Sequence, residues 1–348
     1  MLSEKRMTIR RTVPFLVIGL LIFIGYLYFF VGIPEMLTII QRVDFRFYLL
    51  AVAVLLLNML AYSLTWQYFL RPLSVNVPFR KTFLFTWIGV FVDLLIPAES
   101  ISGDASKAYL MTKDSGENAG KVVASIVSHR ILAMIITLSS LIISSLLLFI
   151  LQYELPALVS NLILLVAIGT AISLIFTFLL CLREKLTRKL IDLLLRFFAF
   201  ILRGRVKLTS LRTKARTALS AFYESIEVLG RHPRSLVRPV FFSIVAWFLS
   251  ILLSYLVFFS LGYRVSFVLL TIVYSISVTI QNIPIGVPGE VGLVEIVMTS
   301  LYGLLGVPLG ISAAATVLIR ILWVWFRILV GFVAVQWIGI KVLIGGSP

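Results

Sequence analysis

Long apolar runs alternate with short polar segments along nearly the whole chain. Six of these runs are uninterrupted and hold about 20 residues or more, enough to cross the hydrocarbon core of a bilayer as an α-helix. The composition is 60% hydrophobic and only 13% charged over 348 residues. The pattern therefore predicts an all-α polytopic membrane protein. The predicted spans are 13–31, 47–70, 122–151, 155–182, 240–261 and 313–340.

Two further apolar runs are broken. The run 82–96 contains Asp93 and ends at Pro97, and the run 265–283 ends at Pro284 before apolar sequence resumes. Proline cannot continue a helix, and non-helical backbone at membrane depth must be satisfied by protein or by a water-filled cavity. The two breaks therefore predict a polar cavity within the membrane.

The distribution of positive charge predicts the topology. Of the 31 Lys and Arg residues, 14 lie between Arg183 and Arg238, and such loops are normally cytoplasmic. The loop that holds Arg71, Arg80 and Lys81 and both chain ends are placed in the cytoplasm as well. The number of crossings between Lys81 and Arg183 must therefore be even. The segment from 82 to about 115 is therefore predicted to be a re-entrant hairpin. The basic linker 183–238 is predicted to form interfacial amphipathic helices, and its charge points to lipid headgroups and not to nucleic acid.

The two halves of the chain resemble each other in order. Segments 47–151 and 239–338 each contain a span, a broken segment and a span, but they start from opposite sides of the membrane. This order predicts an inverted-topology repeat, in which a transport site lies at the repeat interface. An arginine follows each break within the next span, at Arg130 and Arg320. Chance likeness between two loops rich in proline and glycine is the alternative.

Ionisable residues inside predicted spans are costly, so each is a functional candidate. Arg130 and Arg320 can bind a phosphate through the planar fork of the guanidinium, and Arg327 lies on the same helical face as Arg320. Alternatively, Arg130 and Arg320 form structural ion pairs with Glu295 or Asp93. The other candidates are the backbone donors of Gly289 and Gly292 and the charged residues Asp104, Lys107, Glu290 and Glu295.

No catalytic or metal-binding pattern stands out. The chain has two histidines, His129 and His232, and one cysteine, Cys181, which do not make a histidine or cysteine metal site. Asp93 and Asp104 could form a carboxylate pair, but the sequence places no nucleophile beside them. We therefore expect a protein that is not an enzyme and that needs no cofactor.

Several stretches resemble a known family. They are "IPAESISGDASKAYLM", "ASIVSHRILAMI", "VPGEVGLVEIVMTSLYGLLGVP" and "ATVLIRILWVW". The chain, from about residue 10 to 340, is similar to the flippase-like membrane domain of the lysylphosphatidylglycerol synthase family. The family pattern P-G-x-x-G-x-x-E falls on Pro288, Gly289, Gly292 and Glu295. The pattern G-[DE]-x-x-[RK] falls on Gly103, Asp104 and Lys107. The two membrane arginines of the family correspond to Arg130 and Arg320.

Three positions depart from the family pattern: Glu290 stands where a glycine is frequent, Lys107 where arginine is usual, and His129 where an acid is common. The soluble domain of the aminoacyl-transferring members is not expected in this chain. The resemblance therefore implies a lipid translocase in the cell membrane, of flippase or scramblase type, for an anionic phospholipid or a polyprenyl-phosphate lipid. The alternative is a membrane anchor or accessory subunit that presents lipid to a separate enzyme. The oligomeric state is left open.

Overall fold

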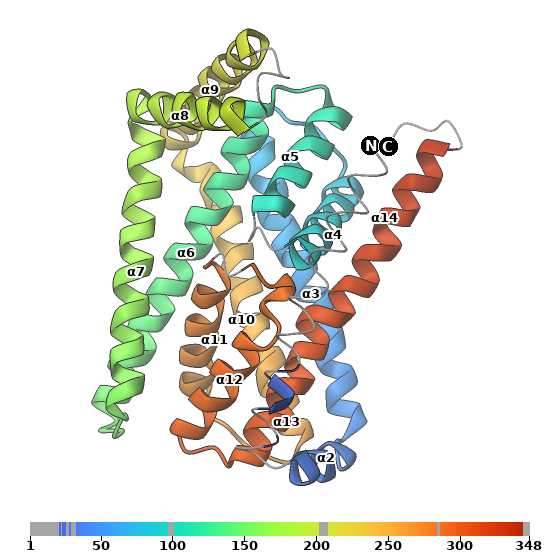
Figure 1. Cartoon of the computed structure of the whole chain (residues 1–348), viewed down its shortest axis with the longest axis vertical. Helices are drawn as coiled ribbons and strands as arrows, with labels where there is room; N and C mark the ends of the chain where they lie inside the picture. The colour runs from blue at the N-terminus through green and yellow to red at the C-terminus, as the bar shows by residue number, and fades with distance from the viewer. Residues whose placement is uncertain are drawn as a thin grey trace.

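The computed structural model describes residues 21, 23–25, 28, 33–96, 101–201, 208–283 and 286–343, and within these residues every regular element is a helix. Five helical stretches are long and apolar enough to cross a membrane. This confirms the prediction of an all-α polytopic membrane protein (Figure 1). The predicted span 13–31 lies almost entirely outside the described residues. The five stretches are Phe45–Leu73, Ala119–Ile150, Ala157–Leu182, Pro233–Ser260 and Leu309–Trp337.

Two long helices form the centre of the molecule. Helix α3 (Phe45–Leu70) packs along α10 (Val237–Ser260), the first long helix of the second half. Asn58 of α3 donates hydrogen bonds to the Ala246 carbonyl oxygen at 2.7 Å and to Ser250 Oγ at 2.9 Å. Small residues on α10 let the two backbones approach closely, as in other membrane helix pairs.

The first hairpin consists of α4 (Phe79–Leu95) and α5 (Ile101–Ser115). With 17 and 15 residues, each helix is roughly 25 Å long or shorter, too short to cross a hydrocarbon core of about 30 Å. Both lie toward the end of the molecule that carries α8 (Glu184–Ile201) and α9 (Leu208–Arg231), and they turn back near its middle (Figure 1). This is the predicted re-entrant shape. Pro97, which was expected to end α4, lies outside the described residues.

The second hairpin enters from the opposite end. It consists of α11 (Phe267–Gln281), the short 3₁₀ turn η4 (Pro288–Glu290) and α12 (Leu293–Leu304), and it occupies the half of the molecule nearest α2 (Ile33–Gln41) (Figure 1). Like the first hairpin, its helices are too short to span a bilayer. Pro284, which was expected to end α11, is outside the described residues.

The final spanning segment is not a uniform helix. Helix α13 (Leu309–Arg320) continues through a π-helical segment, η5 (Ile321–Phe326), into α14 (Arg327–Leu343). A π turn inside a helix is uncommon and frequently marks a functional site. This segment is therefore the part of the second half where a ligand site is most expected.

The two hairpins meet near the middle of the molecule. A Cβ atom built on Gly289 of η4 would lie 3.4 Å from Val324 Cγ1 and 3.7 Å from Leu94 Cδ2 at the end of α4. Each hairpin also packs on a long helix of the other half: α4 on α14, and α11 on α6 (Ala119–Ile150). Reciprocal contacts of this kind are what an inverted repeat requires. The two-fold relation between the halves itself stays a prediction.

Helices α8 and α9 form the predicted linker between the halves and lie across one end of the bundle (Figure 1). Helix α9 packs on α6, where a side chain at Gly120 would overlap the Ala218 carbonyl oxygen. Tyr223 of α9 donates to the Leu180 carbonyl oxygen at 2.5 Å, at the end of α7 (Ala157–Leu182). The linker is thus packed against the bundle and anchored to it.

Candidate functional site: a central cavity between the hairpins

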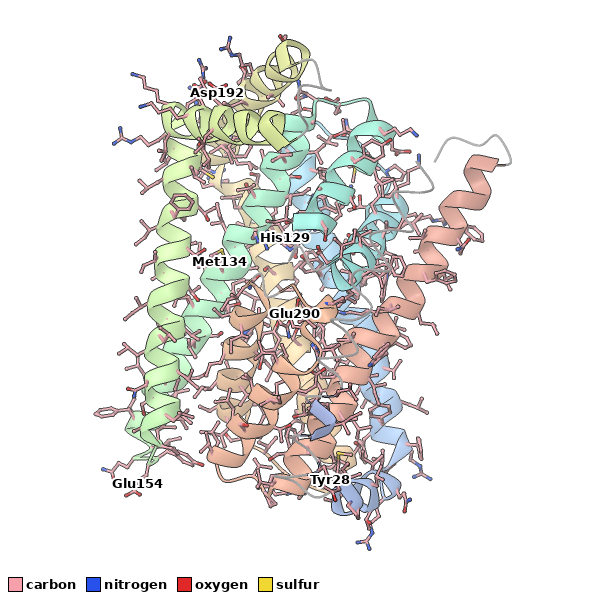
Figure 2. All side chains as sticks on the ribbon, viewed as in Figure 1. Tyr28, His129, Met134, Glu154, Asp192 and Glu290 are labelled. Carbon is pink, nitrogen blue, oxygen red and sulfur yellow. The ribbon has the colours of Figure 1, made fainter. Side chains whose placement is uncertain are left out.

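A cavity of about 320 Å³ lies between the two halves of the bundle. Its lining comes from α3, α4 and α6 of the first half and from α10, α11, η4, α12, α13, η5 and α14 of the second. His129 and Glu290, two of its lining residues, lie near the middle of the long axis of the molecule (Figure 2). The volume is at the lower end of the range for ligand pockets, which suits a lipid headgroup better than a whole lipid.

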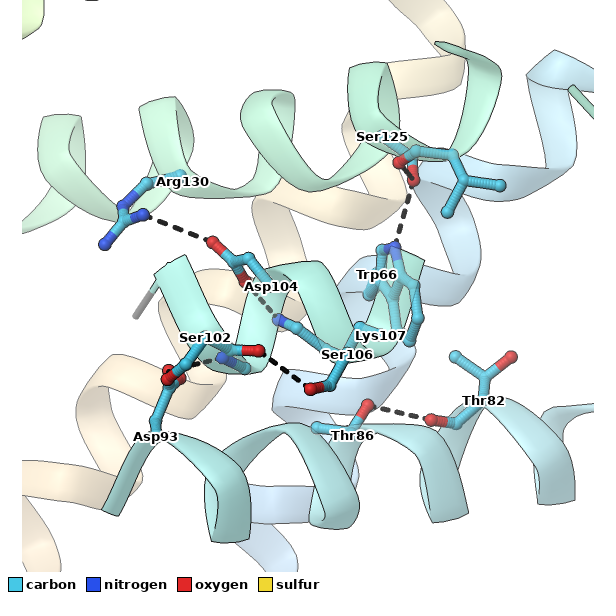
Figure 3. A network of polar contacts seen from close by, with 12 residues as sticks. Trp66, Thr82, Thr86, Asp93, Ser102, Asp104, Ser106, Lys107, Ser125 and Arg130 are labelled. Atoms are coloured by element: carbon cyan, nitrogen blue, oxygen red, sulfur yellow. Dashed lines mark hydrogen bonds and ion pairs between the residues drawn. The ribbon is translucent and has the colours of Figure 1, made fainter. Parts of the chain in front are cut away.

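The first break is closed by a carboxylate that caps the returning helix. Asp93 Oδ1, on α4, accepts hydrogen bonds from the Gly103 backbone N–H at 2.6 Å and from Ser102 Oγ at 2.9 Å, both on α5 (Figure 3). The bond from Gly103 satisfies one of the backbone donors that a helix N-terminus leaves open. A side chain at Gly103 would overlap both the Gly89 carbonyl oxygen and the Asp93 carboxylate, so the close crossing of α4 and α5 requires this glycine.

Asp104 holds two cations beside the same break. Its Oδ1 lies 2.7 Å from Lys107 Nζ, and its Oδ2 lies 3.2 Å from Arg130 Nη1 on α6 (Figure 3). The Lys107 side chain is only 6% exposed, whereas that of Arg130 is 35% exposed. Lys107 Nζ also lies 5.5 Å from the centroid of the Trp66 ring, a distance at which an aromatic face attracts a cation. This cluster joins the first hairpin to α6.

The second break is closed by Glu295. Its Oε2 accepts a 2.7 Å hydrogen bond from the Gly292 N–H at the start of α12, and its Oε1 accepts one of 2.7 Å from Arg320 Nε. Arg320 Nη2 donates to the Gly289 carbonyl oxygen. Gly289 and Gly292 have φ values of +58° and +97°, which glycine adopts without a steric penalty. The pattern P-G-x-x-G-x-x-E thus builds a turn whose own glutamate caps the next helix.

Arg327 differs from the other membrane arginines. Its guanidinium lies 3.8 Å above the Trp323 ring and lines the cavity, and its Nε is buried without a hydrogen-bond partner. Among the described residues no carboxylate lies within 4.0 Å of Arg327. A guanidinium stacked by its face keeps its in-plane N–H donors available. Arg327 therefore brings to the cavity a positive charge that no ion pair with another described residue neutralises.

Comparison with known proteins agrees with this architecture. The family model described as the lysylphosphatidylglycerol synthase transmembrane region matches residues 16–331. The chain belongs to this family. It is 28% identical over 325 residues to a UPF0104 membrane protein of Pyrococcus horikoshii, an alignment that covers 91% of this chain and 96% of the relative. It is also 26% identical over 322 residues to a UPF0104 membrane protein of Methanothermobacter thermautotrophicus, covering 90% and 91% of the two chains.

The predicted site residues of this member of the lysylphosphatidylglycerol synthase transmembrane-region family fall into three groups. Arg320, Arg327 and Glu290 line the central cavity, and Trp323 lies with them, even though the π turn departs from the α-helical spacing on which the prediction rested. Glu295 and Gly289 accept hydrogen bonds from Arg320, and Gly292 donates one to Glu295. By contrast, Asp104, Lys107 and Arg130 form the separate cluster of Figure 3 and are not among the lining residues that the structure describes.

Two of the predicted roles compete with internal bonds. The Gly292 N–H is already bound by Glu295, so its donation to a headgroup would require Glu295 to move. Arg320 is paired with Glu295 and only 5% exposed, as the structural alternative expects. Phosphate binding by Arg320 stays a prediction.

The neutral polar lining of the cavity was not anticipated from the sequence. Asn58, Tyr62, Ser250, Ser254, Tyr274 and Ser277 contribute to it. The available signal was helical spacing: Ser243, Ser250 and Ser254 recur at i, i+7 and i+11 on one face of an otherwise apolar helix. Within the described residues, no group of three or more His, Cys, Asp or Glu side chains could hold a metal ion.

Proposed function

We propose that this protein is a lipid translocase of flippase or scramblase type that moves a phosphate-bearing lipid between the two leaflets. The headgroup would pass through the central cavity while the hydrocarbon chains stay in the bilayer. Membership of the lysylphosphatidylglycerol synthase transmembrane-region family supports a role with membrane lipids. We place the protein in the cell membrane, with the α8–α9 end and both chain termini in the cytoplasm, on the basis of the positive-inside rule.

The observation that carries this proposal is Arg327, which has no carboxylate within 4.0 Å among the described residues. A cation inside a spanning helix without a counter-charge is costly in a low-dielectric environment, which favours an anionic ligand beside it. Stacking on Trp323 at 3.8 Å holds the guanidinium in a fixed plane. A phosphate oxygen can then accept two N–H donors from the edge of that plane. Arg130 and Arg320 are proposed as further phosphate contacts along the path.

Replacement of Arg320 and replacement of Arg327 are expected to have different effects on folding. Removal of Arg320 leaves Glu295 buried with one oxygen unpaired. Among the described residues, no carboxylate is paired with Arg327, so its removal leaves none of them without a partner. The Arg327→Gln protein is therefore expected to fold normally and to lose lipid transport. A loss of about tenfold or more corresponds to one or two charge-assisted hydrogen bonds.

The test uses the full-length protein in liposomes that contain an anionic phospholipid labelled on its acyl chain. Movement is read by bleaching with a reductant that cannot cross the membrane. Arg264→Gln is the control, because Arg264 is exposed in the loop between α10 and α11, away from the cavity. Equal transport by the wild-type and Arg327→Gln proteins would reject the assignment of Arg327. Lipid binding without any transport would favour the accessory role over translocation.

A further inference from the structure

The cavity offers more hydrogen-bond donors than its own acceptors can satisfy. Three of its lining residues have a buried polar atom without a hydrogen-bond partner: Trp247 Nε1 on α10, Ser277 Oγ on α11 and Arg327 Nε on α14. Indole and guanidinium nitrogens in these side chains can only donate. Because a buried donor without an acceptor costs free energy, a ligand that fills the cavity is expected to bring oxygen acceptors to Trp247 on α10 and Arg327 on α14, and a hydrogen-bond partner of either kind to Ser277 on α11.

One phosphate group can serve Arg327, but the remaining donors come from other helices. Ser277 is only 3% exposed and lies on the hairpin that enters from the opposite end to α8 and α9. The neighbouring lining side chains include Ser254, Tyr62 and Tyr274. Hydroxyl groups of this kind both donate and accept, and they therefore match the hydroxyl groups of a ligand, which do the same.

An ammonium headgroup fits this lining less well. Its ammonium group carries only donors, so it would leave Trp247 without an acceptor even where the phosphate of the same lipid serves Arg327. Asp93, one of the two carboxylates in the lining, already accepts two hydrogen bonds from α5 through Oδ1. The aromatic residues Trp247 and Trp323 provide flat apolar faces within the same cavity, which suit the C–H faces of a sugar or cyclitol ring.

We propose that the cavity selects a polyhydroxylated headgroup, a sugar, inositol or glycerol unit joined to lipid through phosphate, over a headgroup that carries an amine. The inference rests on the proposed function and names its class of substrate. Arg327 binds the phosphate, and the ligand's hydroxyl oxygens accept from Trp247 and exchange hydrogen bonds with Ser277. The ring or polyol lies between these groups, in a space of about 320 Å³.

The test compares short-chain lipids that differ only in headgroup, added to the detergent-purified full-length chain. Binding is followed by tryptophan fluorescence, since Trp247 and Trp323 line the cavity. Phosphatidylinositol is expected to bind about two- to tenfold more tightly than phosphatidic acid for each hydroxyl hydrogen bond gained, and phosphatidylethanolamine more weakly than either. Equal affinities, a preference for the amine or no binding of any of these lipids would overturn the proposal.

A soluble competitor separates headgroup recognition from partitioning of the lipid chains. Inositol 1-phosphate is expected to displace phosphatidylinositol at concentrations at least about tenfold lower than those at which inorganic phosphate does so, because only the former brings hydroxyl oxygens. Displacement by inorganic phosphate at the same concentration would show a phosphate site alone and would overturn the polyol assignment.

Ser277 and Thr299 make a matched pair of variants. Both carry a buried hydroxyl group without a hydrogen-bond partner, but only Ser277 lines the cavity. Ser277→Ala is expected to reduce the preference for phosphatidylinositol over phosphatidic acid about two- to tenfold, and Thr299→Val to leave it unchanged. An unchanged preference in Ser277→Ala would overturn the proposal. The binding measurement does not depend on transport. If the wild-type protein prefers phosphatidylinositol but moves no lipid in liposomes, the result would contradict the translocase function and not the headgroup preference.

Discussion

At the scale of single residues, each break in the membrane is held by a carboxylate that accepts a hydrogen bond from a glycine N–H. Asp93 does so for Gly103, and Glu295 does so for Gly292. In both cases the donor belongs to the first turn of the returning helix, where backbone N–H groups lack partners within the helix. The missing side chain at Gly103 allows the close approach of α4 and α5, whereas Gly292 allows a φ of +97°. Each carboxylate also interacts favourably with the positive end of the helix dipole.

The Arg320–Glu295 pair predicts a specific pattern of stability. Arg320→Ala is expected to lower the free energy of unfolding by on the order of 3 to 5 kcal/mol, because it leaves Glu295 buried with an unpaired oxygen. Adding Glu295→Gln should restore part of the loss, since the amide is uncharged and its oxygen can still accept from the Gly292 N–H. Thermal unfolding of the purified variants in detergent measures both effects.

An exposed ion pair serves as the control for that experiment. Arg231 and Glu227 of α9 are paired, but their side chains are 74% and 59% exposed. Arg231→Ala is therefore expected to change stability by less than about 1 kcal/mol. If Arg320→Ala proved equally mild, the buried pair would not be a structural one, and the phosphate-binding role of Arg320 would gain weight.

The residues of these pairs could be named from the sequence, but not their partners. Arg130 could have reached Asp93, Glu295 or Asp104, and only the crossing of α5 and α6 brings Asp104 to 3.2 Å. The contact of Asn58 with α10 could not be predicted either. A single amide in an apolar run is equally compatible with a hydrogen bond inside its own helix. Partner choice depends on how helices pack, and helical spacing alone does not encode it.

At the scale of elements, the α4–α5 hairpin depends on the absence of a side chain at Gly103. Gly103→Ala is expected to destabilise the protein by about 1 to 3 kcal/mol, because the added methyl group would overlap the Gly89 carbonyl oxygen. Helix α5 should then become more accessible, which protease sensitivity or cysteine labelling at Ser115 can measure together with thermal unfolding.

Gly169→Ala in α7 provides the comparison for Gly103→Ala. A Cβ atom at Gly169 would have no neighbour within 4 Å, and alanine is the better helix former by roughly 1 kcal/mol. This variant is expected to be as stable as the wild type or slightly more so. Equal destabilisation of the two variants would mean that the loss of glycine flexibility, and not the close contact at Gly103, accounts for the effect.

The elements themselves were largely predictable, because proline and apolar run length act locally. The predicted span 47–70 corresponds to α3, Phe45–Leu70, and the predicted 155–182 to α7, Ala157–Leu182. The π segment Ile321–Phe326 was not predictable, since "ILWVWF" is as apolar as an ordinary helical turn. Its wider turn follows the buried Arg320, whose bonds to Glu295 and Gly289 depend on tertiary structure.

At the scale of the whole molecule, the two hairpins enter from opposite ends, and this arrangement predicts the sidedness of the loops. In a Cys181→Ser background, cysteines at Ser115 and Arg188 are expected to react with an impermeant reagent only after the cells are opened. A cysteine at Glu154, between α6 and α7, should react in intact cells. Ser115 lies at the end of α5, toward the end of the molecule that carries α8 and α9 (Figure 1).

Reaction of Ser115→Cys in intact cells, with Arg188→Cys still protected, would contradict the re-entrant hairpin. It would require an odd number of membrane crossings between Lys81 and Ser115, although α4 and α5 have only 17 and 15 residues. Reversed labelling at all three positions would instead keep the hairpin and invert the orientation of the whole protein. The positive charge of the α8–α9 linker would then lie outside the cell.

The meeting of the hairpin tips at Leu94 and Gly289 has a consequence for the membrane potential. Where short helices and a polar cavity replace a continuous span, the voltage falls across the few residues that still separate the two sides. A headgroup with one net negative charge that crosses this contact would gain or lose about 2.3 kcal/mol per 100 mV. The distribution of such a lipid between the leaflets would then shift about 50-fold per 100 mV. An imposed potassium diffusion potential is therefore expected to bias the transport of an anionic lipid. Transport of a zwitterionic lipid is expected to stay unchanged.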